Sequence, residues 1–370
     1  MNHIDEFTIQ QFRGLRDLKL EELSQINLLV GGNNSGKTSV LEALSIFANP
    51  LNWRTWWEAA YGREISNLNP LLGPNLIEML TWLFPKGQNT TGANSIEVSF
   101  SGSGKISQQR VSARYEKFTV IAQGWKRARP DGTVEADFDA EGVNIYVSTH
   151  VIPELNASRP SVFNKTFAFA EFRTFPSKIE EEIPSLPTQT VNPFSYILWG
   201  IPQEQWSDVI KAGMKRETIE LLQFFDPGIE EIDLIAERGN QSVLSVRHSK
   251  LGLAPLNTFG SGLRRVFTLA TAIPRVKNGL LLIDELENAI HTKALKKTVN
   301  WLIQSCKQNN VQLFATTHSL EAVDTVIDVT RDMADLTFYR LEQDKGQTTC
   351  VRFDKEMITQ LREELGAEVR

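Results

Sequence analysis

Polar and apolar residues alternate over the first 30 positions of the chain and then change to a helical spacing. The alternation predicts strands at 7–12 and 18–20, and a continuous apolar run predicts a buried strand at 26–30. A helical period follows, at Val40, Leu41, Leu44 and Phe47. The chain is therefore expected to begin as β-structure that leads through a short polar loop into a helix.

The middle of the chain changes pattern several times. Residues 49–92 contain Trp53, Trp56, Trp57 and Trp82 and carry a helical period at 76–83, which favours a packed helical subdomain over a ligand cage. Alternation then predicts strands from 95 to 122 with a turn at Ser101–Gly104, and further β-structure at 143–151 and 167–172. Five prolines between 175 and 202 predict an irregular excursion, and a helix is expected at 203–225.

Strand-like residues at 229–246 precede an alternation of helices and strands that continues from Leu256 onward. The expected fold class is α/β, and the middle region is too long to be a loop, so it must contain packed elements of its own. We predict three segments: the N-terminal part of one domain at 1–48, an inserted helical and β region at 49–214, and the C-terminal part of that domain at 215–370.

Composition and charge narrow the class of protein only slightly. The 370 residues are 41% hydrophobic and 23% charged, with a net charge of −6, which is typical of a globular protein and not of a polyanion-binding one. The basic residues Lys126, Arg127 and Arg129 favour a solvated loop over a nucleic-acid groove. Two cysteines without C-x-x-C spacing, and no apolar run of membrane-spanning length, lead us to expect a reducing, cytoplasmic location and no membrane partner.

A glycine-rich loop joins the strand at 26–30 to the helix that follows it. Residues 31–38 fit the pattern G-x-x-x-x-G-K-[S/T], in which small residues let backbone N–H groups surround an anion at the start of a helix. Lys37 would reach the outer phosphates and the Thr38 hydroxyl would bind Mg²⁺. The alternative is a chance glycine turn before a lysine, which the flanking strand and helix disfavour. The predicted ATP contacts are Gly31, Asn33, Asn34, Ser35, Gly36, Lys37, Thr38 and Ser39.

A second apolar run, at 279–283, ends in two carboxylates. A buried parallel strand would deliver Asp284 and Glu285 to the sheet edge where the phosphates are expected. Asp284 would hold Mg²⁺, and Glu285 would orient or deprotonate the attacking water. The alternative is a buried strand that is merely followed by an acidic loop. The glycine-rich loop earlier in the chain disfavours this alternative.

Two further segments complete the expected chemistry. A third apolar strand, 311–315, leads to His318, which could hydrogen-bond the γ-phosphate or the attacking water. Residues 259–265 place Gly260, Ser261 and Gly262, with Arg264 and Arg265 beside them, just before a helix expected at 266–273. One nucleotide needs one phosphate loop, so a second anion seat indicates a site that a neighbouring subunit completes.

These motifs resemble, in order, those of the ABC-type ATPases of the SMC, recombination-repair and OLD (overcoming lysogenization defect) group, often called AAA family ATPases. The matching segments are Phe12–Leu15, Gly31–Thr38, Phe259–Arg265, Leu282–His291 and Phe314–Ser319. The resemblance implies a two-lobed P-loop head whose two protomers enclose two ATP molecules, with a higher oligomer left open. Residues 259–265 would be the signature motif, 288–291 the D-loop and His318 the switch histidine, while Arg13 would contact the nucleotide.

The sequence departs from the family at one position and lacks two of its additions. Gly260 stands where the signature motif usually has a serine, and Ser261 follows one position later. We expect no long coiled-coil arm, because there is no long heptad stretch, and no Toprim nuclease, because too few residues follow His318. No residue is assigned to the glutamine loop.

Two functions are compatible with these features. The first is an ATPase whose nucleotide-dependent dimerisation gates a separate effector, with a nuclease in phage defence or DNA maintenance as the candidate. The second is a nucleotide-gated DNA-binding or scaffold protein of the repair type with slow turnover, against which the acidic balance counts mildly. The ATPase subunit of a membrane transporter is a further alternative, but the large inserted region disfavours it.

Overall fold

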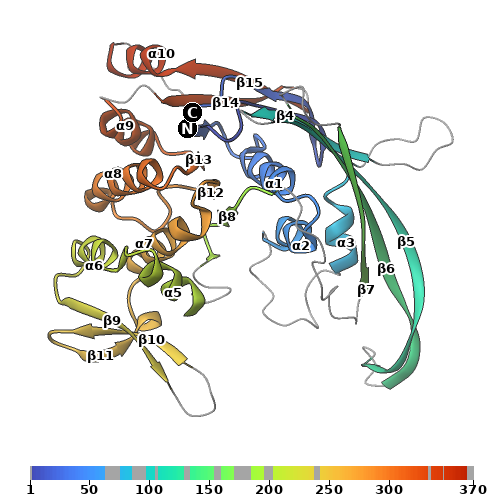
Figure 1. Cartoon of the computed structure of the whole chain (residues 1–370), viewed down its shortest axis with the longest axis horizontal. Coiled ribbons are helices and arrows are strands. Elements are labelled where there is room, and N and C mark those ends of the chain that lie inside the picture. Colours follow the sequence, from blue (N-terminus) through green and yellow to red (C-terminus); the bar gives the residue numbers. More distant parts are fainter. Residues whose placement is uncertain are drawn as a thin grey trace.

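The structure, a computed structural model, describes residues 2–62, 76–85, 97–104, 107–128, 134–153, 160–170, 185–195, 203–236, 242–331, 335–344 and 346–364. At its centre is a six-stranded sheet in the order β15-β14-β3-β13-β12-β8 (Figure 1). The neighbouring strands are parallel except for β14 and β15, which are antiparallel. The bounds of these strands are β3 Ile26–Val30, β8 Thr188–Val191, β12 Leu280–Ile283, β13 Gln312–Thr316, β14 Leu336–Asp344 and β15 Gln347–Asp354.

Two antiparallel sheets flank this centre. The larger runs in the order β2-β1-β4-β5-β6-β7, so strands from the middle of the chain extend the hairpin with which the chain begins. Its strands are β1 Glu6–Phe12, β2 Leu15–Leu20, β4 Glu97–Gly104, β5 Ser107–Ala128, β6 Val134–Pro153 and β7 Ser161–Ala170. The smaller sheet consists of β9 Ile229–Ala236, β10 Ser242–His248 and β11 Gly252–Pro255.

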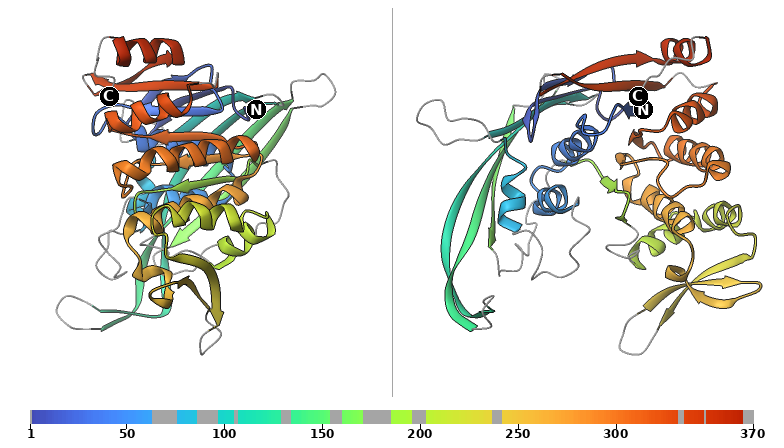
Figure 2. Two further views of the ribbon diagram at one scale, coloured as in Figure 1. Left: turned by 90° about the vertical axis from the view of Figure 1, so that its left-hand side faces the viewer. Right: turned by 180° about the vertical axis from the view of Figure 1, so that it is seen from behind.

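The helices form two groups on either side of the central sheet (Figures 1 and 2). The group between the central and the large antiparallel sheet is α1 Lys37–Ala48, α2 Trp53–Tyr61 and α3 Leu76–Thr81. The other group is α5 Gln203–Lys211, α6 Lys215–Gln223, α7 Ser261–Ala272, α8 Thr292–Gln308 and α9 Leu320–Val329. The remaining short elements are α10 Lys355–Thr359, η1 Leu256–Thr258, η2 Ile273–Val276 and η3 Gln360–Glu364.

The central strands are buried on both faces and divide the interior into two cores. Leu28 packs with the core of α5–α9, whereas its neighbour Leu29 packs with the core of α1–α3 and the large sheet. Leu281 and Leu282 of β12 divide in the same way, because successive side chains of a strand point to opposite faces. This double burial is the physical reason why these strands read as continuous apolar runs in the sequence. Among the described residues, no helix is both long and apolar enough to cross a membrane.

The predicted strands at the start of the chain and the α/β alternation of the second half are confirmed. The turn predicted at Ser101–Gly104 is wrong, because these residues lie in β4 and pair with both β1 and β5. Glycine is needed at position 102 because a Cβ there would lie 2.7 Å from Phe47 Cζ and clash with that ring. From Ser107 onward, the β-structure predicted up to residue 122 is one continuous strand, β5.

Two other predictions need correction. The segment predicted to be irregular, 175–202, contains β8, a polar strand at the edge of the central sheet. This strand is too short for its alternation of polar and apolar residues to be recognised in the sequence. Residues 175–184 and 196–202 lie outside the described residues. The helix expected at 203–225 is two helices, α5 and α6, because Gly213 adopts a φ of 75° between them.

Candidate functional site

Three parallel strands bring their carboxyl ends together beside the start of α1. Asp284 follows β12, Thr316 ends β13, and Thr38 lies in the first turn of α1. The Thr38 Oγ1 donates to both Asp284 carboxylate oxygens, at 3.2 Å and 3.0 Å, and the Thr316 Oγ1 donates to Asp284 Oδ1 at 2.6 Å. Two segments 246 positions apart in the sequence thus meet at a single carboxylate.

The Glu285 backbone is held in an unusual conformation next to this carboxylate. Its φ is 52°, in the left-handed region that residues other than glycine rarely adopt. Its N–H donates to Thr316 Oγ1 at 2.9 Å, and its Oε2 accepts from Asn288 Nδ2 at 3.2 Å. Backbone strain of this kind concentrates at functional sites, where the surrounding structure fixes it.

The phosphate-loop segment forms a small cradle at the start of α1. The Lys37 Nζ donates to the carbonyls of Gly31 and Gly32, at 2.7 Å and 2.8 Å. Burial lowers the pKa of Lys37, against the attraction of Asp284, Glu285 and Glu287, which raises it. The Ser35 hydroxyl is buried with no hydrogen-bond partner among the described residues.

Glycines give the loop its shape. Gly31 and Gly36 have φ values of 144° and 95°, and Asn34, at 65°, also lies in the left-handed region. A Cβ on Gly31 would lie 2.4 Å from the Leu341 carbonyl oxygen, so the loop approaches β14 at a distance that only glycine permits. Asn33 is exposed, and Ser39 is buried within α1.

These residues fit a nucleotide with Mg²⁺. Mg²⁺ prefers oxygen ligands and is usually held by one or two carboxylates together with substrate phosphates. Asp284 and the Thr38 hydroxyl supply such oxygens, and the orphaned Ser35 hydroxyl is a donor without an acceptor at the place where an anion would lie. Lys37, now bonded to its own loop, carries the charge that a triphosphate would attract.

Arg13, also predicted to contact the nucleotide, has partners inside its own chain. Its φ is 51°, and its Nε lies 2.8 Å from Glu42 Oε2 in α1. Its Nη2 donates to the Ala59 carbonyl at the end of α2, 2.9 Å away. In this structure Arg13 joins the first hairpin to α1 and α2.

The signature segment starts a helix earlier than expected. The helix predicted at 266–273 begins at Ser261, so Gly260 precedes the first turn of α7 and Ser261 lies exposed within it. Gly262 packs against the D-loop, because a Cβ there would lie 2.7 Å from the Ala289 carbonyl oxygen. Ala289 itself has a φ of 60°.

The prediction that Arg265 reinforces an anion seat is wrong. Its side chain is fully buried and donates to the carbonyls of Asn192, Asp284 and Glu285. It therefore braces the backbone that carries the two carboxylates. The sequence could not distinguish this inward arginine from an outward one, because both follow the same glycines.

His318 lies at the exposed margin of the site. Its side chain is 53% exposed, and its Nδ1 is 3.4 Å from Glu287 Oε1, which also accepts from the His318 N–H at 3.3 Å. Glu287 therefore orients the histidine in this structure. A second oxygen of that carboxylate, Oε2, is buried without a partner among the described residues.

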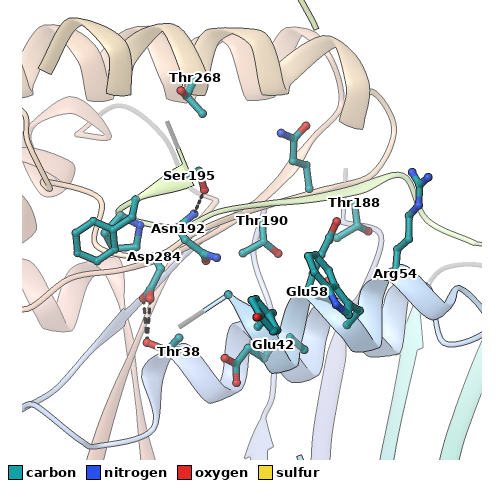
Figure 3. Close-up of a pocket in the computed structure, with 18 of the residues that line it drawn as sticks. Thr38, Glu42, Arg54, Glu58, Thr188, Thr190, Asn192, Ser195, Thr268 and Asp284 are labelled. Atoms are coloured by element: carbon teal, nitrogen blue, oxygen red, sulfur yellow. Dashed lines mark hydrogen bonds between the residues drawn. The ribbon is translucent and has the colours of Figure 1, made fainter. Parts of the chain in front are cut away.

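Sequence reasoning missed the contribution of β8. This strand runs parallel to β12, so Asn192, which follows it, reaches the same edge of the sheet as Asp284. Asn192 lines a cavity of about 960 Å³ that extends from Thr38 and Asp284 along β8, with Thr188 and Thr190 in its wall (Figure 3). A polar residue directly after a short strand is the signal that could have identified it.

Comparisons with known proteins agree with this geometry. Residues 171–324 match the family model "AAA domain, putative AbiEii toxin, Type IV TA system", and residues 3–112 match the model "AAA ATPase domain". A protein of Helicobacter pylori named ATP/GTP phosphatase is 23% identical over 354 residues, covering 89% of each chain. An uncharacterised protein of Methanocaldococcus jannaschii is 32% identical over 112 residues, which is 30% of this chain and 98% of that protein.

A shorter sequence match and a structural match also indicate an ATPase fold. The DNA replication and repair protein RecF of Saccharophagus degradans is 42% identical over 55 residues, 15% of each chain. An SMC head solved in complex with the C-terminal winged-helix domain of ScpA has a similar fold, with a TM-score of 0.50, 13% identity and coverage of 96% of this chain and 99% of that one. Residues 3–112 and 171–324 thus match AAA ATPase models, and the fold of the chain is that of an SMC-type P-loop ATPase head.

Proposed function

We propose that the chain is a Mg²⁺-dependent ATPase of the OLD-like type in which Lys37 and the 31–39 segment bind the ATP phosphates. The observation that supports this most directly is the Thr38–Asp284–Thr316 contact at the start of α1. Thr38 and Asp284 would hold Mg²⁺, which neutralises charge on the transferred phosphoryl group. Thr316 would hold Asp284 in place through the hydroxyl that it donates.

Glu285 is the proposed base for the attacking water. Its backbone is fixed by Thr316 and its carboxylate by Asn288, so the side chain would be positioned before the substrate arrives. Asn192, at the end of the adjacent strand β8, is the proposed second polar contact to that water or to Mg²⁺. His318, oriented by Glu287, would contact the γ-phosphate from the exposed side.

The active form is proposed to be a homodimer with ATP at the interface. Gly260 and Ser261 are exposed at the start of α7, where backbone N–H groups and the helix dipole favour an anion. The signature segment of one protomer would thus contact the nucleotide bound by its partner. The Ser261 hydroxyl, one position later than usual, would donate this contact.

The proposed role of the dimer is to gate a separate effector, with a nuclease in antiviral defence or DNA maintenance as the candidate. The match of residues 171–324 to a toxin-associated AAA model supports an effector-linked role. The short RecF likeness favours a second candidate, a nucleotide-gated DNA-binding protein. ATP-dependent binding to duplex DNA that weakens steeply with salt would favour this second function.

The ATPase proposal is tested with Glu285→Gln, which keeps the shape of the side chain and removes the base. We expect phosphate release to fall by about 10²–10⁴-fold, since general-base catalysis contributes this much, while ATP binding persists. Glu78→Gln, an exposed carboxylate on α3, is the control. Turnover that continues unchanged in Glu285→Gln contradicts the proposed role.

The effector is tested by co-purification with the product of the adjacent gene. We expect the Glu285→Gln chain with Mg·ATP to retain this partner and Lys37→Ala to lose it. A partner that binds both variants equally would contradict nucleotide gating while leaving the ATPase proposal intact.

A further inference from the structure

The cavity of about 960 Å³ extends well beyond the metal end of the nucleotide site. Thr38 and Asp284 lie at one end, and Arg54 and Glu58 of α2 lie at the other (Figure 3). Pockets for small organic ligands have volumes of about 300–1,000 Å³. Lys37 and the glycines of the phosphate loop do not line the cavity, so its far end has room for a molecule other than the triphosphate.

Aromatic side chains form one wall of this far end. Trp53, Trp57 and Tyr61 recur every four residues on one face of α2, and all three line the cavity half-buried. The Trp57 and Tyr61 rings are stacked, with centroids 5.2 Å apart and planes at 7°. Trp56, by contrast, is fully buried and donates to the Pro50 carbonyl, as a packing tryptophan does. The tryptophan-rich segment thus serves both the core and the cavity.

A carboxyl group without a partner lies beside this wall. No described residue lies within hydrogen-bond or ion-pair distance of the Glu58 carboxyl group, although the side chain is open to the cavity. Surrounding protein raises the pKa of Glu58, against the attraction of Arg54 and Arg275, which lowers it. Glu58 is exposed, so a ligand that donates hydrogen bonds to its carboxylate would take the place of water there.

The charges around the cavity exclude one class of ligand. Among the residues that the structure describes, the lining has five carboxylates and two guanidinium groups, which together repel anions. The carboxylates are Glu42, Glu58, Glu204, Asp284 and Glu285, and the guanidinium groups are Arg54 and Arg275. A molecule with N–H donors or a positive charge fits this lining better than a phosphate.

The opposite wall is polar. The Thr188 and Thr190 side chains of β8 face the cavity across from α1 and α2 (Figure 3), and Gln205 of α5 lines it too. A flat molecule could therefore place one face on the tryptophans and its polar edge toward Glu58 and β8. We propose that the far end of the cavity binds an amino-substituted aromatic heterocycle of the nucleobase or nucleoside class, without phosphates, at a site separate from that of ATP.

The test measures binding to the full chain in the Lys37→Ala background, so that its outcome does not depend on ATP turnover. The probes are cytidine, adenosine and guanosine, with inorganic phosphate as the anionic comparison, by isothermal titration calorimetry. We expect at least one nucleoside to bind with a Kd below about 1 mM. Failure of all three to bind, or binding of phosphate alone, would overturn the proposal.

Variants locate the site. Glu58→Gln is nearly isosteric but replaces one acceptor oxygen by a donor, so the affinity for the nucleoside should fall by about tenfold or more. Trp57→Ala should weaken binding similarly. Glu78 and Trp82 are exposed and lie outside the cavity lining, so Glu78→Gln and Trp82→Ala should leave the affinity for the nucleoside within about twofold of the parent value. Equal affinity in Glu58→Gln and the parent would overturn the proposal even if Trp57→Ala lowers stability.

Discussion

One hydroxyl group, that of Thr316, joins the two carboxylate residues of the site. It donates to Asp284 at 2.6 Å and accepts from the Glu285 N–H at 2.9 Å. Thr316→Val keeps the shape but leaves this N–H unpaired, so we expect a loss of roughly 1–3 kcal/mol in the free energy of unfolding. The Mg²⁺ concentration for half-maximal ATPase activity should rise by about tenfold or more, because residues that orient a metal ligand tune its affinity.

Urea unfolding and Mg²⁺ titration of ATPase activity measure these two effects. The matched control is Thr298→Val, which removes another buried threonine hydroxyl, one that donates to Ala294 within α8. It should leave the Mg²⁺ dependence unchanged. An unaltered Mg²⁺ titration in Thr316→Val would remove Thr316 from the proposed metal site.

Lys37 illustrates how a charge that is proposed to bind phosphate opposes the stability of the folded chain. Its pKa lies below the usual 10.5 because burial penalises the charged form. Between the lowered value and 10.5 the unfolded chain binds more protons than the folded one, so the contribution of Lys37 to stability rises with pH across this window. Lys37→Met should therefore be at least as stable as the parent without ATP, yet gain no stability from Mg·ATP.

Denaturant unfolding with and without Mg·ATP tests this expectation. The exposed Lys293 of α8 provides the control, since Lys293→Met should keep the full stabilisation by nucleotide. A marked loss of stability in nucleotide-free Lys37→Met would show that the two hydrogen bonds to Gly31 and Gly32 outweigh the burial of the charge.

At the scale of elements, the turn before α1 requires glycine at one position. Gly31→Ala would bring a Cβ to 2.4 Å from the Leu341 carbonyl oxygen of β14, at a φ of 144° that alanine disfavours. We expect a lower melting temperature and ATP affinity reduced by about tenfold or more. At the adjacent Gly32, no atom of the described residues lies within 4 Å of a Cβ, so alanine should leave the melting temperature unchanged. Equal melting temperatures for both variants would contradict this account.

The elements that could be predicted from sequence are those with a strong local signal. Buried parallel strands such as β3 and β12 appear as continuous apolar runs because both faces are covered. The polar strand β8 has no such run, and only its pairing with β12 identifies it as a strand. The turn predicted at 101–104 failed for a related reason, because glycine there reflects the close approach of Phe47 and not a reversal of the chain.

The site divides in the same way. The Gly31–Thr38 pattern and the Asp284–Glu285 pair were identifiable, because their residue types and spacing follow from the chemistry. The inward direction of Arg265 and the bridge through Thr316 depend on tertiary packing, which no local pattern records. The cavity at α2 likewise joins elements that are more than 100 residues apart, such as Trp57 and Thr188.

In the whole molecule, the proposed nucleotide site lies where the two cores meet at the central sheet. Leu29 of strand β3 packs in the core of α1–α3 and Leu28 packs in the core of α5–α9, and the loop that follows β3 carries the proposed phosphate-binding residues. Thr38 belongs to α1, which packs in the core shared with the large antiparallel sheet, whereas α7 packs in the core on the other face of the central sheet. A ligand that bridges both would therefore couple the relative position of the two layers to nucleotide binding.

The proposed dimer gives the exposed start of α7 a role that a single protomer does not require. Ser261→Glu places a carboxylate in the first turn, where the helix dipole favours it, so the monomer should fold normally. In the dimer the same charge would face the partner's triphosphate and repel it. We expect ATP affinity within about twofold of the parent, loss of the dimer, and hydrolysis reduced by about tenfold or more.

Light scattering of Glu285→Gln with Mg·ATP should give twice the 41.7 kDa of one chain, and the added Ser261→Glu change should return it to one chain. Ser161→Glu, at the exposed start of β7, supplies the control for added charge and should leave the dimer intact. The dimer proposal fails if Ser261→Glu dimerises and hydrolyses ATP as the parent does. If the Glu285→Gln chain keeps the mass of one chain with Mg·ATP, the dimer proposal is contradicted independently, because bound ATP that is not hydrolysed should hold two protomers together.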